Sequence, residues 1–225
     1  MSSIIAGNVV AVQAEIAAAC ARSRRAASDV RLIAVTKSQG PEVLAALAAA
    51  GVCDFGENRV EHLAAMHEAA PPAARFHAIG RIQSRQIARV VALAACLHSL
   101  CDHDHLAELS RRLEQGARRM QVFVQVNTSG EASKAGLAPA DLARFVDEVR
   151  AAPAVDLVGL MTMAPMVDDA ARGADGDAVR RCFAELRALS EIHRLPRLSM
   201  GMSQDFIIAV EEGATDVRVG TRLFA

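Results

Sequence analysis

RLIAVTK, residues 31–37, is a run of apolar residues that ends on a single lysine. Four consecutive apolar positions, 32–35, favour a strand covered on both faces, as in the parallel sheets of α/β proteins. Lys37 would then stand at the carboxyl end of that strand. A lysine held against low-dielectric walls loses solvation as an ammonium and can supply the neutral amine that attacks an aldehyde. A surface lysine that ends a strand would look the same, so this stretch alone leaves both interpretations open.

Further short apolar runs follow, separated by turn residues and helical patterns. We expect strands at 31–37, 52–56, 75–80, 96–100, 121–127, 155–161, 198–200 and 216–220. We expect helices at 3–24, 41–50, 58–70, 83–93, 104–116, 139–151, 178–193 and 205–213. A polar, glycine-containing stretch at 168–177 is expected to form a mobile loop.

This alternation of eight strands with seven helices, after one initial helix, predicts a single (β/α)8 TIM barrel domain over residues 1–225. The extra N-terminal helix, with Val10, Ala14 and Ala18 near helical spacing, is expected to pack between strands eight and one. It would cover the face that a last helix would otherwise cover. A doubly wound open sheet is the alternative, but it requires a glycine-rich fingerprint after strand one, and TKSQGP (36–41) does not match GxGxxG.

Composition narrows the classes of partner. The formal net charge of −1 offers no broad attraction for nucleic acid or an anionic membrane. Five cysteines at scattered spacing, without a CxxC motif, indicate reduced thiols and a cytoplasmic location. Gln13 and Glu15 interrupt the first apolar segment, and no basic start precedes it, which argues against a signal peptide or a membrane span.

Two glycine turns fall at the ends of the expected seventh and eighth strands, where barrels frequently bind phosphate. Gly201-Met202-Ser203 precedes a helix, and Gly220-Thr221 follows the last strand. Glycines let backbone N–H groups approach an anion, and the hydroxyls of Ser203 and Thr221 add donors. The alternative is a pair of ordinary turns with Ser203 as a helix N-cap.

An amine on strand one that faces a phosphate site at strands seven and eight suggests a phosphorylated aldehyde, of which pyridoxal 5′-phosphate (PLP) is the obvious example. The chain also resembles the pyridoxal phosphate homeostasis protein family, which is related in fold to the barrel domain of alanine racemase. The resembling segments are AVTK (34–37), DFGEN (54–58), FHAIGRIQS (76–84), HSL (98–100), VQVNTSGEASKAGL (124–137), GLMTM (159–163), LSMGMSQDF (198–206) and VRVGT (217–221). They span nearly the whole chain in the family's order.

The resemblance implies that Lys37 carries PLP as an aldimine and that Ser203, Gly220 and Thr221 hold its phosphate. It further implies a protein that takes part in intracellular PLP homeostasis and passes PLP to PLP-dependent apoenzymes. Neither nucleic acid nor a membrane is an expected partner, in agreement with the net charge. Such a protein would have no turnover of its own and would be a monomer or a weak dimer.

By the same resemblance, Arg218 would meet the pyridine nitrogen of PLP. Because a guanidinium only donates, that nitrogen would stay unprotonated and the ring would be a poorer electron sink. The alternative is that Arg218 spans the barrel to pair with a carboxylate such as Glu57. Asn58, His77 and Met161 would line the mouth and pack around the ring, or else make satisfied hydrogen bonds and fill the core.

A PLP-dependent amino-acid racemase with weak activity is the alternative function. Two-base racemisation needs an acid–base group opposite the lysine, and in the racemase relatives a tyrosine from another domain supplies it. This chain has no tyrosine, so a cysteine or His77 would have to serve. A pure interaction protein is disfavoured because both the lysine and the phosphate site are intact.

CLHSLCDHDH, residues 96–105, gathers cysteine, histidine and aspartate side chains and suggests a zinc site. Its spacing matches no CxxC or HxxxH pattern, and Asp102 or Asp104 fits a helix N-cap after strand four. We therefore expect no metal site in this stretch.

Overall fold

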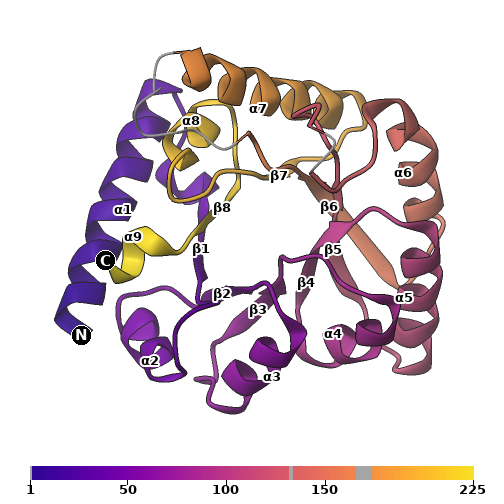
Figure 1. Ribbon diagram of the computed structural model, residues 1–225, viewed down its shortest axis with the longest axis horizontal. Coiled ribbons are helices and arrows are strands. Elements are labelled where there is room, and N and C mark those ends of the chain that lie inside the picture. Colours follow the sequence, from indigo (N-terminus) through magenta and orange to yellow (C-terminus); the bar gives the residue numbers. More distant parts are fainter. Residues whose placement is uncertain (1, 132–133, 166–173) are drawn as a thin grey trace.

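Eight parallel strands form a closed barrel in which each strand pairs with the next one along the chain, and the last pairs with the first (Figure 1). The structure is a computed structural model that describes residues 2–131, 134–165 and 174–225. The strands are β1 (Arg31–Val35), β2 (Asp54–Glu57), β3 (Arg75–Ala78), β4 (Cys96–Leu100), β5 (Met120–Gln125), β6 (Val155–Met161), β7 (Arg197–Ser199) and β8 (Asp216–Val219). The predicted TIM barrel is confirmed.

Helices ring the barrel and connect its strands (Figure 1). They are α1 (Ser2–Arg22), α2 (Glu42–Ala49), α3 (Val60–Glu68), α4 (Ile87–Leu93), α5 (His103–Gln115), α6 (Leu142–Arg150), α7 (Ala174–Ile192), α8 (Phe206–Glu211) and α9 (Thr221–Phe224). Three 3-10 turns, η1 (Ala27–Asp29), η2 (Ser84–Gln86) and η3 (Pro139–Asp141), lead into β1, α4 and α6. The loop expected at 168–177 falls mostly outside the described residues, and its last part, from Ala174, already belongs to α7.

Two boundaries differ from the prediction in ways that concern the site. β1 ends at Val35, so Lys37 lies in the turn after the strand rather than on it. A helix also follows β8, where none was predicted, although α9 is only one turn long. Apolarity indicates which residues are buried, whereas pairing with both neighbouring strands decides where a strand stops.

The N-terminal helix α1 packs against α2, α8 and α9, so it occupies the predicted place beside β8 and β1 (Figure 1). The side chain of Asn8 donates to the backbone carbonyls of Leu223 (3.3 Å) and Ala225 (3.0 Å), which ties this helix to the end of the chain.

The residues whose spacing predicted α1 do not lie on its buried face. Ile5, Val9, Val12 and Ile16 are its buried apolar residues, whereas Val10 is 65% exposed. In a helix this rich in alanine, apolar residues stand on every side, so helical spacing alone does not identify the buried face.

By length and apolar composition α1 would also be able to cross a membrane. A core helix passes the same test. Here, a third of the most apolar window is buried inside the fold, and the packing of Ile5, Val9 and Val12 accounts for that apolar character.

The side chains in the interior of the barrel are more polar than those packed between the strands and the surrounding helices. Alternate strand residues point outward to the helices, where they form the main apolar core. Among the inward-facing residues, Cys96, Phe123 and Met161 form a separate small apolar cluster. A hydrogen bond joins β4 to β7, which are not neighbours in the ring, so its partners His98 and Ser199 meet across the interior. The barrel is therefore filled partly by a polar network.

Candidate functional site

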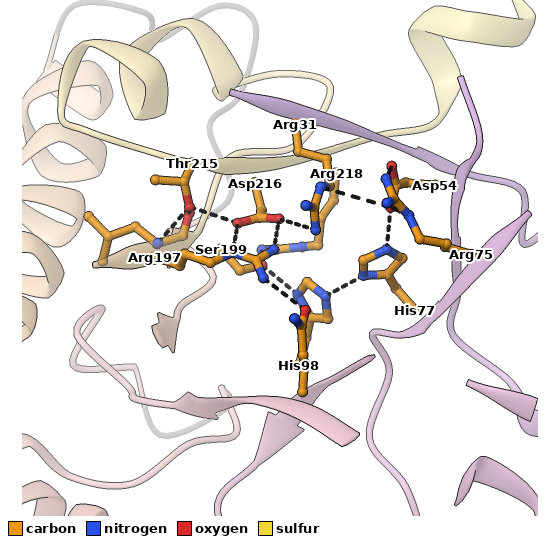
Figure 2. A network of polar contacts seen from close by, with 12 residues as sticks. Arg31, Asp54, Arg75, His77, His98, Arg197, Ser199, Thr215, Asp216 and Arg218 are labelled. Atoms are coloured by element: carbon orange, nitrogen blue, oxygen red, sulfur yellow. Dashed lines mark hydrogen bonds and ion pairs between the residues drawn. The ribbon is translucent and has the colours of Figure 1, made fainter. Parts of the chain in front are cut away.

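A chain of buried side chains crosses the barrel from Arg218 to Asp54 (Figure 2). Arg218 Nη1 donates to Ser199 Oγ (2.7 Å), and Ser199 Oγ lies 2.7 Å from His98 Nδ1. His98 Nε2 lies 2.9 Å from His77 Nδ1, and His77 Nε2 lies 2.9 Å from Asp54 Oδ1. We call these five residues the polar chain.

The two ends of the polar chain fix the direction of its outer hydrogen bonds. A guanidinium has only donors, so Ser199 Oγ accepts from Arg218, and a carboxylate only accepts, so His77 Nε2 donates to Asp54. A neutral His98 ring has one donor and one acceptor, so it donates to one of its two neighbours, Ser199 and His77, and accepts from the other.

Burial and charge reinforce this proton arrangement. Burial, together with His77 and Arg218, lowers the pKa of His98 well below its usual value. Burial opposes ionisation of Asp54, but hydrogen bonds from His77 and Arg75 outweigh it and bring its pKa down to about 2. Asp54 is therefore a carboxylate at neutral pH.

Arg218 remains a cation in a fully buried setting. Burial lowers its pKa to about 10, against the opposing effect of Asp205 and Asp216. Besides Ser199, it donates to the Thr162 carbonyl (3.1 Å) through Nη2. Each terminal nitrogen therefore keeps a second N–H group beyond these two bonds.

Glu57 is not the partner of Arg218, so that alternative was wrong. Its carboxylate instead makes a short contact with the Thr36 hydroxyl and lies 2.7 Å from His62 Nδ1. Burial raises the pKa of Glu57, although its hydrogen bonds with Thr36 and His62 oppose that rise. Glu57 thus anchors the turn that carries Lys37 rather than neutralising the arginine.

Lys37 itself is exposed in the turn after β1, not enclosed by low-dielectric walls as the sequence suggested. The residue before it, Thr36, is fully buried and holds Glu57. A Cβ atom on Gly220 would lie 3.1 Å from the Val35 carbonyl oxygen, so the end of β8 packs closely on the end of β1. Lys37 and Gly220 therefore share one end of the barrel.

The two glycine turns meet at that same end. The backbone N–H of Gly220 donates to Ser203 Oγ (3.1 Å), which joins the loop after β7 to the loop after β8. Gly201 has φ +92°, and a Cβ there would lie 2.6 Å from Ala209 Cβ, so only glycine fits. Ser203 is not the N-cap of α8, as the alternative supposed, because the N-cap residue is Asp205.

Thr221 and Asn58 are exposed at the strand ends, as expected of residues at the mouth. Asn58 follows β2, and its carbonyl oxygen would lie 2.2 Å from a Cβ on Gly80. His77 and Met161 lie deeper, at 2% and 1% exposure. Both nitrogens of His77 are bonded within the polar chain, and Met161 packs in the small inner cluster, so these two residues fill the interior instead of lining an open mouth.

Sequence reasoning missed His98, Ser199 and Asp54 as members of one network. The signal was available in the HSL and LSM segments, since polar residues inside otherwise apolar strands require buried partners.

The two halves of the segment 96–105 have different roles in the structure. Asp102 caps α5 by accepting from the His105 N–H (2.9 Å), as predicted.

Cys96 and His98 from that segment point into the barrel, where they and His77 place possible ligand atoms within 4.8 Å of one another. The 2.9 Å hydrogen bond between the two imidazoles occupies the space a shared metal ion would need. Burial also raises the pKa of the Cys96 thiol strongly, which disfavours the thiolate.

Comparisons with known proteins agree with this architecture. The family described as Alanine racemase, N-terminal domain, matches residues 12–225. A pyridoxal phosphate homeostasis protein of Aquifex aeolicus is 36% identical over 214 residues, which cover 92% of this chain and 91% of that protein.

Two solved structures extend the comparison. PipY of Synechococcus elongatus, solved with PLP bound, has a TM-score of 0.81 and 31% identity and covers 98% of this chain and 100% of that one. Alanine racemase of Corynebacterium glutamicum has a TM-score of 0.74 at 16% identity, covering 99% of this chain and 60% of that one, and so shares the fold. On these matches, the chain belongs to the pyridoxal phosphate homeostasis protein family.

Proposed function

We propose that this protein binds PLP at the carboxyl end of the barrel, through Lys37, and serves intracellular PLP homeostasis without turnover of its own. The observation that carries the proposal is the convergence of three loops. The turn bearing Lys37 adjoins Gly220, and Gly220 is bonded to Ser203. The amine of Lys37 and the two glycine-containing loops after β7 and β8 therefore lie at the same end of the barrel. The relative PipY was solved with PLP bound, which supports the same ligand here.

The phosphate would be held by Ser203, Gly220 and Thr221. Ser203 Oγ accepts from the Gly220 N–H, so its own hydrogen is available to an anion. Thr221 is exposed at the start of α9 and adds a second hydroxyl. This set supplies neutral donors, which suits a phosphate ester whose other end is fixed elsewhere.

Arg218 would meet the pyridine nitrogen with an N–H group not used by Ser199 or Thr162. PLP supplies an electron sink when its ring nitrogen is protonated. A guanidinium has no proton to give at neutral pH, so Arg218 would hold that nitrogen as an acceptor and weaken the sink. The polar chain anchors Arg218 in this orientation, which favours storage over reaction.

Asn58, His77 and Met161 would contribute at different depths. Asn58 is exposed at the mouth and would contact the ring from the β2 side. His77 and Met161 would form part of the floor beneath it, since both are buried in the interior.

The covalent part of the proposal is tested by reduction and peptide mapping. The chain contains two lysines, Lys37 and Lys134. Purified protein mixed with PLP, treated with borohydride and digested should carry the label on the Lys37 peptide. Lys37→Ala should lose the reducible adduct and keep weaker, noncovalent binding. Lys134→Ala, which removes an amine 3.9 Å from Glu131, is the matched control and should label normally. Label on Lys134 in the Lys37→Ala protein would sink the assignment.

The absence of turnover is tested separately, because weak racemisation is the competing function. His77 has no free nitrogen in the polar chain, and the chain has no tyrosine. Cys101 lies partly exposed directly after β4, but burial raises the pKa of its thiol, which makes it a poor base. General acid–base help is worth about 10²–10⁴-fold. Conversion of L- to D-alanine by the loaded protein should stay near the free-PLP background. A clearly faster rate that disappears in Lys37→Ala would establish the racemase instead.

We further infer a cytoplasmic protein that is a monomer or weak dimer and passes PLP to PLP-dependent apoenzymes. Exposure of Lys37 supports such transfer, since an incoming amine can reach the attachment point. Transfer to an apo-aminotransferase, followed by recovery of its activity in the presence of a trap for free PLP, would test delivery.

A further inference from the structure

A cavity of about 670 Å³ opens at the amino end of the barrel, opposite to the end that carries Lys37. Five of its lining residues are the first residues of their strands, and all five are charged: Arg31, Asp54, Arg75, Arg197 and Asp216. We call these five residues the basal cage (Figure 2). The parallel sheet brings the starts of β1, β2, β3, β7 and β8 to one edge, which concentrates three guanidinium groups around two carboxylates.

The two aspartates of the cage are fully used by two of the arginines. Arg75 donates to Asp54 from Nε (2.9 Å) and Nη2 (2.6 Å). Arg197 donates to Asp216 from Nε (3.1 Å) and Nη2 (2.5 Å). Asp54 also accepts from His77, and Asp216 from the Thr215 hydroxyl. Each carboxylate oxygen therefore has at least one donor already.

Among the three arginines of the cage, Arg31 is the one that makes no hydrogen bond to either aspartate. Its Nε lies 3.9 Å from Asp54 and its Nη1 lies 3.6 Å from Asp216, so both contacts are ion pairs without a hydrogen bond. In the part of the chain that the structure describes, its guanidinium has no acceptor within hydrogen-bond distance. Its side chain is 33% exposed and lines the cavity.

Charge and shape indicate what such a cage would hold. The three guanidiniums of the cage face its two carboxylates and the exposed carboxylate of Asp29, which also lines the cavity, so the lining carries no excess charge. Its distinctive group is Arg31, whose planar donor fork is unused. Guanidinium forks bind two-oxygen anions in a bidentate manner. The neighbouring aspartates would repel a dianion more strongly than a single carboxylate at this range.

We propose that the basal cage is a second binding site, for a small ligand with a carboxylate group, and that Arg31 is its principal contact. The site is separate from the proposed PLP site, since it lies at the opposite ends of the strands. Its existence does not depend on the function proposed above.

The test uses the full chain and acetate as the probe, followed by backbone amide NMR shifts at constant ionic strength set with chloride. Acetate should shift amides around the cage, such as those of Arg31, Asp54 and Asp216, in a saturable way and leave that of Gly220 unchanged. Arg31→Gln should weaken this binding roughly ten- to 100-fold. Arg31→Lys keeps the charge but not the fork and should give an intermediate affinity.

Arg144→Gln is the matched control, because Arg144 is an exposed arginine of α6 paired with Glu148 far from the cage in sequence. It should bind acetate as the natural protein does. Unchanged acetate affinity in the folded Arg31→Gln or Arg31→Lys protein would overturn the proposal, as would shifts that do not saturate. Inorganic phosphate at neutral pH is the second probe and should bind the cage more weakly than acetate. Tighter phosphate binding there would overturn the carboxylate assignment.

Discussion

His98→Gln should remove a specific part of the protein's acid sensitivity. His98 is 0% exposed, is stacked on Phe123 with ring centroids 4.5 Å apart, and has both nitrogens bonded. Its pKa in the folded state is well below the usual value, mainly through burial and then through His77 and Arg218. An unfolded imidazole titrates near pH 6.5. The unfolded state therefore binds more protons below that pH.

The sign and size of the effect follow from this difference. A depressed folded pKa means that the stability contributed by neutral His98 is complete above about pH 6.5 and is lost as the pH falls below it. One proton per molecule corresponds to about 1.4 kcal/mol per pH unit. Because the unfolded imidazole is only half protonated at pH 6.5, the free energy of unfolding should fall by about 1 kcal/mol between pH 6.5 and 5.5 from this residue alone. Carboxylates with ordinary or lowered pKa contribute mainly at lower pH.

Urea unfolding at a series of pH values measures this slope directly. His98→Gln should be less stable than the natural protein at pH 7.5 by about 1–3 kcal/mol, because the glutamine amide cannot bond to both His77 and Ser199 with the geometry of the imidazole ring. Its slope between pH 6.5 and 5.5 should be shallower by the amount above. His67→Gln, on the exposed side of α3, is the control for losing one imidazole. An identical slope in His98→Gln and the natural protein would refute the neutral-histidine account of the polar chain.

Two further outcomes are expected from single sites. Gly80→Ala should destabilise the fold by about 1–3 kcal/mol in urea unfolding, since the new Cβ would lie 2.2 Å from the Asn58 carbonyl oxygen, whereas Gly7→Ala, with nothing within 4 Å, should be neutral or stabilising; equal effects would show that the contact relaxes freely. If the proposed phosphate site is right, Ser203→Ala with Thr221→Ala should weaken PLP retention in equilibrium dialysis more than either change alone, each lost bond being worth roughly 1.5–3 kcal/mol. Natural affinity in the double variant would place the phosphate elsewhere.

The fold was predictable because its information is local and repeated. Each βα unit carries its own apolar run, turn residues and helical pattern, and β5 or α5 would be recognised in isolation. The contact face of α1 was not predictable in this way. Alanine surrounds the helix, and the decision between Val10 and Val9 depends on the shape of α2 and α8, which the local sequence does not contain.

The residues of the candidate site likewise fall into those that the sequence could predict and those that it could not. The positions of Lys37 and Ser203 in turns after strands were predictable because turn residues mark those segments. The polar chain was not found, because a strand covered on both faces gives no alternation to separate inward from outward positions. His98 and Ser199 are then assigned to the interior only once the ring is closed and β4 faces β7.

The position of α1 has a consequence for how the chain is made. Its contacts with Leu223 and Ala225, and the ion pair between Glu15 and Arg222, join residues more than 200 positions apart. On a ribosome, this helix emerges before β1 and these partners emerge after β8. Its apolar face must therefore wait for these partners until all eight strands have been synthesised, and exposed apolar surface promotes aggregation in the meantime. Transplanting the helix to follow β8 by circular permutation would shorten that wait, and should reduce aggregation of nascent chains without changing the finished barrel.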